Sequence, residues 1–240
     1  GRHSEDAAVT LDGTWGVISG CTFENNTNET RDGGGCKVRT RPDPAGRDSP
    51  PPIQWFFLDC SFIDNWADEN AAFDIRSETG GLFDGCEMVG NSGPEFGGTG
   101  EVDYQLATPA KWIFSECVYT DNTVRAGNFD GAIELLLLGS SFQNSGTLRI
   151  TTFDAPFAKV RNCTFENCGA PVAGAVYASA SVDLLEFYDC AFSGNDSPES
   201  HGGAIRVRYA SSVKISKCMF LDNSSVKDGG AVFAWVEDLF

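Results

Sequence analysis

Apolar and polar residues recur along this chain in one short pattern, Cys-x-Phe-x-x-Asn, which appears with variations eight times between residues 21 and 223. Every copy has an apolar residue three positions before the Cys, and most have a polar residue or glycine directly before it. Apolar–polar alternation over a few residues indicates a strand, and the break in phase between the two apolar positions indicates a bend. The Phe position is large and apolar or aromatic in all copies: Phe23, Phe62, Met88, Tyr119, Phe142, Phe165, Phe192 and Phe220.

A second element follows the Cys position by about 12 to 15 residues. Small residues open it and an apolar–polar alternation continues it, as in Gly202 to Val207 and Gly229 to Val232. We assign Gly131 to Leu135 to the same element. Small residues admit a sharp turn and close backbone approach, and the alternation predicts another strand.

Most copies lie 23 to 31 residues apart, which suits one turn of a three-sided parallel β-helix. A leucine-rich repeat has a similar period but needs regularly spaced leucines, which are absent. Equivalent residues of successive coils are then expected to stack about 4.8 Å apart. The stacked positions predict three structural ladders: an aromatic one, a thiol one of Cys21, Cys60, Cys86, Cys117, Cys163, Cys190 and Cys218, and an amide one of Asn26, Asn65, Asn91, Asn122, Asn195 and Asn223.

The paired elements resemble the repeats of the polymorphic outer-membrane-protein family of surface adhesins. The best matches are Phe192 to Asn195 with Gly202 to Ile205, and Phe220 to Asn223 with Gly229 to Val232. More broadly, the chain resembles the pectin-lyase-like right-handed β-helix superfamily. The resemblance implies an all-β fold, a right-handed parallel β-helix of about eight coils with three short strands each. It also implies an extracellular or cell-surface structural or adhesive role in an appendage or filament, without assigning a ligand.

The uninterrupted repeat predicts one β-helix domain over residues 1–240, which we expect to be a piece of a longer protein. The first two copies are 39 residues apart, and residues 37–54 supply the excess. This stretch is basic and rich in proline, so we expect a projecting loop rather than an internal strand. It is either a tolerated insertion or a cationic contact for an acidic partner.

The charge and the hydropathy of the chain limit the classes of partner that can be expected. The net charge is −17, and the 17 lysines and arginines are thinly spread, which argues against nucleic acid. The longest apolar run is far too short to cross a bilayer, so no membrane insertion is predicted. An acidic surface aids solubility or attracts cations such as calcium. We expect other protein chains or further β-helix segments, and glycans as a further possibility, to be the partners.

Nine cysteines leave at least one unpaired. Buried thiols behave as small hydrophobes, and we favour stacked free thiols, with Cys163 and Cys168 as the best pair for a disulfide if one forms. The cysteines lack the close spacing of zinc sites, so no metal site is predicted. Five Asn-x-Ser/Thr sequons suggest a secreted glycoprotein. Asn28 and Asn162 are the better glycan acceptors, because the others include ladder positions.

One face offers a candidate site for chemistry. We expect Asp74, Glu101 and Glu134 to form an acidic column on the outward face of one sheet, with Arg76 and Asp103 beside it. A polysaccharide lyase uses carboxylates to hold calcium and an arginine to stabilise charge, so a calcium-dependent lyase or glycan-binding module is the alternative function. The same residues on a solvated, non-catalytic face are the simpler interpretation. On that view Asp74→Ala is expected to have almost no effect on stability.

Overall fold

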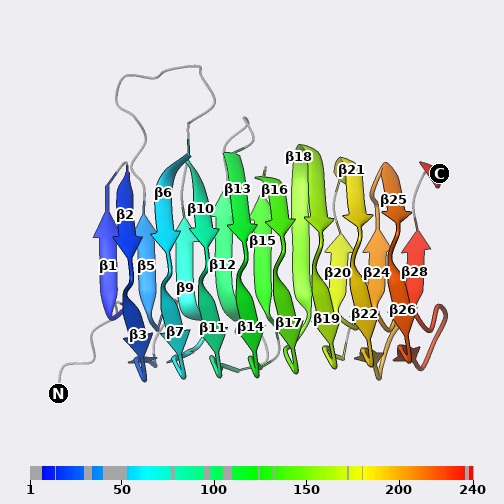
Figure 1. The fold of residues 1–240 in the computed structure, drawn as a ribbon, viewed down its shortest axis with the longest axis horizontal. Helices are drawn as coiled ribbons and strands as arrows, with labels where there is room; N and C mark the ends of the chain where they lie inside the picture. Colours follow the sequence, from blue (N-terminus) through cyan, green and yellow to red (C-terminus); the bar gives the residue numbers. More distant parts are fainter. Residues whose placement is uncertain are drawn as a thin grey trace.

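The computed structural model describes residues 7–13, 15–29, 34–39, 53–76, 79–94, 98–104, 110–123, 125–131, 133–171, 173–179, 181–235 and 238–239. Within these residues the chain forms strands and no helix, and every strand pair in the sheets is parallel. Successive coils lie side by side in sequence order along the longest axis (Figure 1). The predicted all-β parallel solenoid is therefore confirmed.

Three sheets form the sides of the solenoid, and each coil contributes one strand to each of them. Sheet A contains β1 (Val9–Asp12), β5 (Cys36–Arg39), β9 (Asn70–Arg76), β12 (Gly98–Tyr104), β15 (Gly127–Gly131), the first part of β18 (Leu148–Arg161), β20 (Val176–Ser179), β24 (Ile205–Arg208) and β28 (Val232–Trp235). Sheet B contains β2 (Gly16–Ser19), β6 (Ile53–Leu58), β10 (Gly80–Asp84), β13 (Ala110–Ser115), β16 (Ile133–Leu138), the second part of β18, β21 (Ser181–Tyr188), β25 (Ser212–Ser216) and β29 (Asp238–Leu239).

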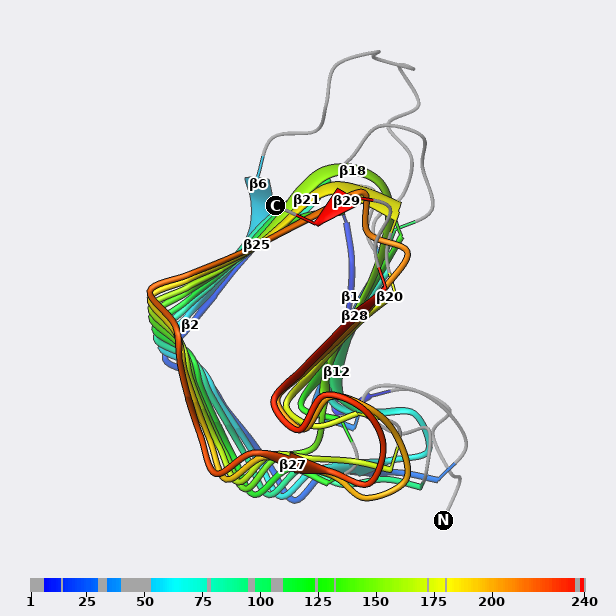
Figure 2. The same cartoon turned by 90° about the vertical axis from the view of Figure 1, so that its right-hand side faces the viewer.

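Sheet C has eight short strands: β3 (Thr22–Glu24), β7 (Ser61–Ile63), β11 (Glu87–Val89), β14 (Val118–Thr120), β17 (Ser141–Gln143), β19 (Thr164–Glu166), β22 (Ala191–Ser193) and β26 (Met219–Leu221). Eight equivalent strands enclose about seven complete turns. Two small pairs follow sheet C, β4 (Thr27–Asn28) with β8 (Trp66–Ala67) and β23 (Asp196–Ser197) with β27 (Ser224–Ser225). Figure 2 looks along the stack and shows the coils superposed around one interior.

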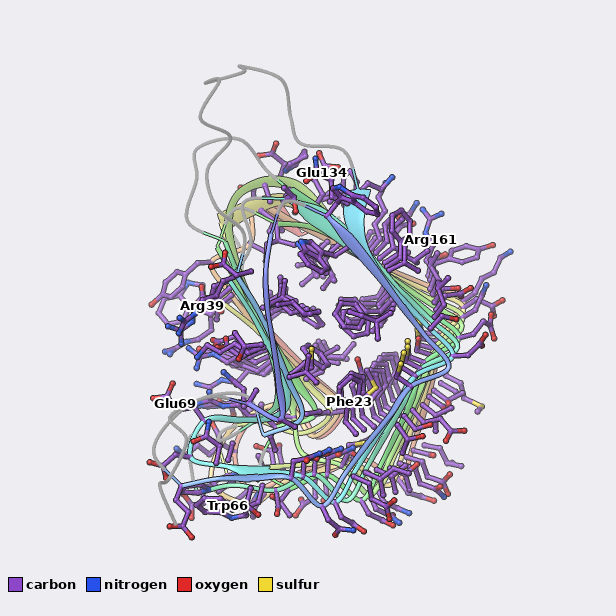
Figure 3. The ribbon with its side chains drawn as sticks, turned by 90° about the vertical axis from the view of Figure 1, so that its left-hand side faces the viewer. Phe23, Arg39, Trp66, Glu69, Glu134 and Arg161 are labelled. Atoms are coloured by element: carbon purple, nitrogen blue, oxygen red, sulfur yellow. The ribbon has the colours of Figure 1, made fainter. Side chains whose placement is uncertain are left out.

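The central residue of each sheet C strand points into that interior. The register joins Phe23 to Phe62 and continues through Met88, Tyr119, Phe142, Phe165 and Phe192 to Phe220. Neighbouring rings stack face to face, with centroids 4.8 Å apart for Phe165 and Phe192. Figure 3 shows this row beginning at Phe23. All members except the last are buried, so the row forms the centre of the core.

Two rows of left-handed residues make the corners at the ends of sheet C. One precedes the Cys position and the other precedes the Asn position, and both have φ between 47° and 63°. Glycine, asparagine and aspartate tolerate this conformation best. They fill all of the second row: Asn25, Asp64, Gly90, Asp121, Asn144, Asn167, Gly194 and Asp222. The predicted bend therefore has a defined backbone cause.

Asparagines at the second corner form a hydrogen-bonded ladder in two runs. Asn65 donates its backbone N–H and its Nδ2 to Oδ1 of Asn91, at 3.2 and 3.0 Å. Nδ2 of Asn91 donates to the carbonyl of Phe62 at 2.8 Å and to Oδ1 of Asn122 at 3.1 Å. Each buried amide thus satisfies backbone groups of the neighbouring coil. Ser145 and Cys168 interrupt the ladder between Asn122 and Asn195.

Glycines admit bulky neighbours and close backbones from adjacent coils. A Cβ on Gly81 would lie 2.2 Å from the ring of Trp112, its register partner in β13. A Cβ on Gly174 would lie 1.5 Å from the carbonyl oxygen of Gly203. Adjacent coils therefore fit together where a large side chain on one coil lies against a glycine, which has no side chain, on the next. Gly16 and Trp55 are another such pair.

The boundaries expected for the projecting loop need correction. Residues 37–39 belong to β5, and Ile53 and Gln54 begin β6, so both ends of the 37–54 segment are strand. Lys37 is buried, and an ion pair with Asp74 on the neighbouring coil compensates the charge of its ammonium group. Residues 40–52 lie outside the described residues.

Candidate functional site

Polar and aromatic side chains line the outward face of sheet A in a single column. From β5 to β28, the register places one residue of each coil directly above the next. We call this row the sheet A column: Lys37, Asp74, Glu101, Asn128, Arg149, Tyr177, Arg206 and Phe233. It contains two of the three carboxylates expected in an acidic column, and it changes from charged pairs at one end to arginine and aromatic residues at the other.

Asp74 is buried rather than solvated, which corrects the expectation of a solvated acidic face. Its Oδ2 lies 3.0 Å from Nζ of Lys37, which is also buried, and its Oδ1 lies 3.3 Å from Nε of Arg76. An opposite charge on the coil below and a guanidinium on its own strand thus compensate the buried carboxylate. Asp74 therefore contributes to structure, and the solvated side chain on which the expectation of a silent Asp74→Ala rested is wrong.

Glu101 occupies the next coil and is held by two amides. Nδ2 of Asn70 donates to its Oε2 at 2.8 Å, and Nδ2 of Asn128 donates to its Oε1 at 2.6 Å. Both carboxylate oxygens are engaged, and the carboxylate is fixed in place between two coils. Asp103 lies two residues further along β12, in register with Arg76 and Asp130.

Glu134 does not belong to the column. It lies in β16 of sheet B, where its register partner is Lys111. Figure 3 places Glu134 and Arg39 on different faces of the solenoid. The error came from Gly131-Ala132-Ile133, which resembles the small-residue element of the other coils. Asn128 in β15 is the true occupant of that coil's position.

Arginine and aromatic groups fill the second half of the column. The guanidinium of Arg206 lies over the Tyr177 ring, 5.4 Å from its centroid, and His201 stacks on Phe233 at 4.4 Å. Burial, and then the neighbouring charge of Arg208, lower the pKa of Arg206. Burial and the charge of Arg149 likewise lower the pKa of Arg125. These groups can stack on a ring and donate hydrogen bonds to an anion.

The described residues contain no group of three or more His, Cys, Asp or Glu side chains placed to hold a metal ion. The carboxylates of Asp74 and Glu101 are engaged by protein donors. Calcium takes six to eight oxygen ligands, so a site here would need these carboxylates to rearrange or ligands from elsewhere.

All nine cysteines lie in the described part of the chain, and all are free thiols. Seven stack at the predicted ladder position, where each thiol points at backbone carbonyls, such as Sγ of Cys86 at 3.4 Å from the oxygen of Phe57. Cys168 is also free, so the disulfide considered with Cys163 is absent. Burial raises the pKa of Cys36 to about 12 and that of Cys168 to about 11. These thiols stay protonated and act as core residues.

The two preferred glycan acceptors, Asn28 and Asn162, differ in their exposure to solvent. Asn28 in β4 is buried, with 1% of its surface exposed, so the expectation that it carries a glycan is corrected. Asn162 is exposed at a left-handed corner next to sheet C. Asn195 and Asn223, which also head sequons, are ladder residues bonded to one another.

A family model described as the right-handed beta helix region matches residues 53–220, which is more than half of the chain. The chain belongs to the right-handed β-helix family. No curated protein and no solved structure matches it. The match supports the superfamily expected from the sequence and gives the solenoid its hand.

Sequence reasoning missed three polar members of this β-helix face: Asn70, Asn128 and Arg149. Asn70 opens β9 directly before Ala71 and Ala72, the two small residues assigned to the second element. Asn128 lies directly after Gly127, at the start of β15. A polar residue that follows a glycine and precedes an aromatic was the available signal at Asn128. Among the residues that the structure describes, no helix is long and apolar enough to cross a membrane.

Proposed function

We propose that this β-helix is a non-catalytic structural or adhesive segment that works outside the cell or on its surface, as part of an appendage or filament. The observation that carries the proposal is that protein donors engage the carboxylates of Asp74 and Glu101 on sheet A. Lys37, Asp74 and Arg76 compensate one another, and both oxygens of Glu101 accept amide hydrogen bonds. A catalytic carboxylate has to reach substrate or metal, whereas these carboxylates tie neighbouring coils together.

The recurring motifs support the same role. Cys, Phe and Asn positions build the interior and its corners, so the repeated part of the sequence serves the scaffold. The resemblance to repeats of polymorphic outer-membrane proteins favours a surface adhesin, whose partners are other protein chains, further β-helix segments or glycans. Exposed Asn162 suits a glycoprotein if the source glycosylates such sites.

The test is an activity assay with a matched variant. The purified chain is incubated with calcium and polygalacturonate or related acidic glycans, and unsaturated products are followed by ultraviolet absorbance. We expect no turnover by the wild type. Turnover that is lost in Glu101→Gln but kept in Glu134→Gln would overturn the proposal, because only Glu101 lies in the sheet A column.

A calcium-dependent lyase or glycan-binding module is the second candidate. Arg149, Tyr177 and Arg206 occupy consecutive coils, which favours a ligand that is both ringed and anionic. Affinity electrophoresis in gels containing polygalacturonate distinguishes this candidate from the first. Retardation that disappears in Arg149→Gln and Tyr177→Ala supports binding, and calcium chelation separates a metal-dependent from a direct contact.

A further inference from the structure

The thiol ladder repeats a reactive group at one place in the cross-section of the solenoid. Backbone pairing sets the cysteines of neighbouring coils in line, since Ala191 donates its N–H to the carbonyl of Cys163 at 2.9 Å and the other coils repeat this bond. Ser140 takes the Cys position in the fifth copy of the motif and divides the ladder. The two parts are a run of four thiols and a run of three: Cys21, Cys60, Cys86 and Cys117, and then Cys163, Cys190 and Cys218. Figure 3 shows sulfur atoms (yellow) following one another along the stack.

Every thiol of the ladder has the same orientation. Each Sγ lies between 3.2 and 3.6 Å from the carbonyl oxygen two residues earlier in the chain. Because this contact recurs in all seven, neighbouring sulfurs repeat at about the spacing of the coils. That spacing is 4.8 Å between the ring centroids of Phe165 and Phe192, which lie two residues after Cys163 and Cys190.

Two sulfurs in line suit a metal ion that takes two ligands on opposite sides. A zinc–thiolate bond is about 2.3 Å long, so two bonds of this length in line span about 4.6 Å, close to the coil spacing. Thiolates select soft ions such as Cu(I), which accepts two sulfur ligands in a linear arrangement. The described residues hold no group of three or more His, Cys, Asp or Glu placed to bind a metal ion. An ion in the ladder would thus have two protein ligands, which does not suit the tetrahedral coordination of zinc.

The surroundings of the sulfur pairs favour a cation. Sγ of Cys190 lies 3.4 Å from the carbonyl oxygen of Val160, which belongs to the coil of Cys163. This oxygen borders the space between the two thiols with the negative end of its dipole. A hydrogen bond with the Cys163 thiol lowers the pKa of Cys190 to about 7, and one with the Cys117 thiol lowers the pKa of Cys86. One proton of each pair is therefore released more easily, and thiols must lose their protons to bind a metal.

We propose that neighbouring thiols of the ladder bind Cu(I), with one ion between two cysteines of consecutive coils. Each ion forms two Cu–S bonds, displaces two thiol protons to solvent and keeps its oxidation state. The run of four thiols can form two such pairs, and the run of three can form one, with one thiol left over. We therefore expect three ions in the ladder. The inference goes beyond the proposed function and does not depend on it, because the ladder is mostly buried whereas adhesion uses the outer surface.

The first experiment separates the pairing of neighbours from a simple count of thiols. Cys36→Ala and Cys168→Ala remove the two cysteines outside the ladder. This chain is refolded without air in excess Cu(I), so that the ion can reach the interior, and a coloured Cu(I) chelator then removes weakly held ions.

We expect the chain to retain three ions. Cys190→Ser should retain two, because Cys163 and Cys218 then have no neighbour. Cys218→Ser should still retain three, because Cys163 and Cys190 remain a pair although one thiol has again been lost. Equal copper content in these two variants, or no retained copper, would overturn the proposal.

The second experiment restores the missing member of the ladder. Oγ of Ser140 donates to the carbonyl of Leu138, two residues earlier, at 3.0 Å, so a thiol at this position should take the orientation of the others. Ser140→Cys joins the two runs into eight thiols and should raise the copper content from three ions to four, whereas the matched Ser140→Ala should leave it at three. X-ray absorption should show two sulfur neighbours for each ion. Three ions in Ser140→Cys, or copper with nitrogen or oxygen ligands, would mean adventitious binding only. Circular dichroism checks that each variant forms the β-helix.

Discussion

Asp74 illustrates how a charged residue at an outward strand position can be a structural residue. The position alternates with buried apolar residues, so the sequence favours exposure, yet no part of Asp74 is exposed. Its partner Lys37 comes from the preceding coil, 37 residues earlier in the chain. A contact of that sequence separation depends on the register, which the pattern of single strands does not fix.

Asp74→Ala should lower the free energy of unfolding by about 3–5 kcal/mol, because it breaks a buried ion pair in which Nζ of Lys37 lies 3.0 Å from the carboxylate of Asp74. Denaturant unfolding at neutral pH measures the change. Glu134→Ala is the control and should alter stability little, since Glu134 is partly exposed on sheet B. A double variant, Lys37→Met with Asp74→Leu, should regain much of the loss; if it is as unstable as Asp74→Ala, the broken ion pair is not the cause.

Phe165→Ala or Phe192→Ala should cost about 3–5 kcal/mol, because the rings on either side are fixed by their own strands and cannot fill the space. Phe165 stacks on Phe142 at 4.7 Å and on Phe192 at 4.8 Å. Denaturant midpoints of these variants are compared with Thr164→Ala, an exposed residue of the same strand. Equal midpoints for Phe165→Ala and Thr164→Ala would mean that the assignment of inside and outside is wrong.

At the scale of the element, the corners rather than the strands set the shape of each coil. Sheet C strands have only three residues, and a left-handed residue lies near each end of every one of them. Cys and Asn each follow one of these residues, which explains their fixed separation in the motif. The amide ladder then joins corner to corner along the stack.

Asn91→Ala tests this ladder. The substitution removes the acceptor for the N–H and Nδ2 of Asn65 and two donations from Asn91 itself, all of them buried. An unsatisfied buried polar group costs about 1–3 kcal/mol, so we expect a loss at the upper end of that range or above. Ser145→Ala occupies the same ladder position, where the contacts to Asn122 are long at 3.4 and 3.5 Å. It should lose less than half as much in the same thermal or denaturant melt.

The strands and the inward ladders could be predicted from the sequence because they rest on local alternation and on a motif that repeats in every coil. The sheet A column could not be predicted fully, since the small-residue element occurs twice near residues 127–133 and only the pairing of β15 with β12 decides between the two. Lys37 and Asn28 were assigned to the surface for a similar reason: neighbouring coils, which the local pattern does not include, bury them.

At the scale of the whole molecule, the thiols form a buried column that crosses most of the coils. Burial disfavours the thiolate along the column, whereas a hydrogen bond with the Cys117 thiol lowers the pKa of Cys86 and one with the Cys163 thiol lowers the pKa of Cys190 to about 7. Cys21 at one end is exposed, whereas Cys60 to Cys190 are buried. Accessibility therefore changes sharply within one coil.

Alkaline pH should destabilise the molecule. The ordinary thiol pKa is 9.0, whereas the pKa of Cys36 is about 12 and that of Cys168 about 11. Because the folded values are the higher ones, the stabilisation is complete below pH 9 and is lost as pH rises toward these values. Denaturant unfolding between pH 7.5 and 10.5 should show this decline. Cys36→Ala should make the slope shallower, while a reductant should leave the midpoint unchanged; an unchanged slope would contradict the assignment.

The two rows of left-handed corners have a consequence for how such a molecule can change over time. Each coil carries its own corners and its own member of every inward row, so these two features alone do not specify the position of a coil in the series. The stretch from Ser140 to Asn162 is one complete coil, and its removal would join Gly139 to Cys163 with every later residue still at its proper corner. Every coil has the same cross-section, whereas the number of coils can change. Whole coils can therefore be duplicated or lost as single genetic events.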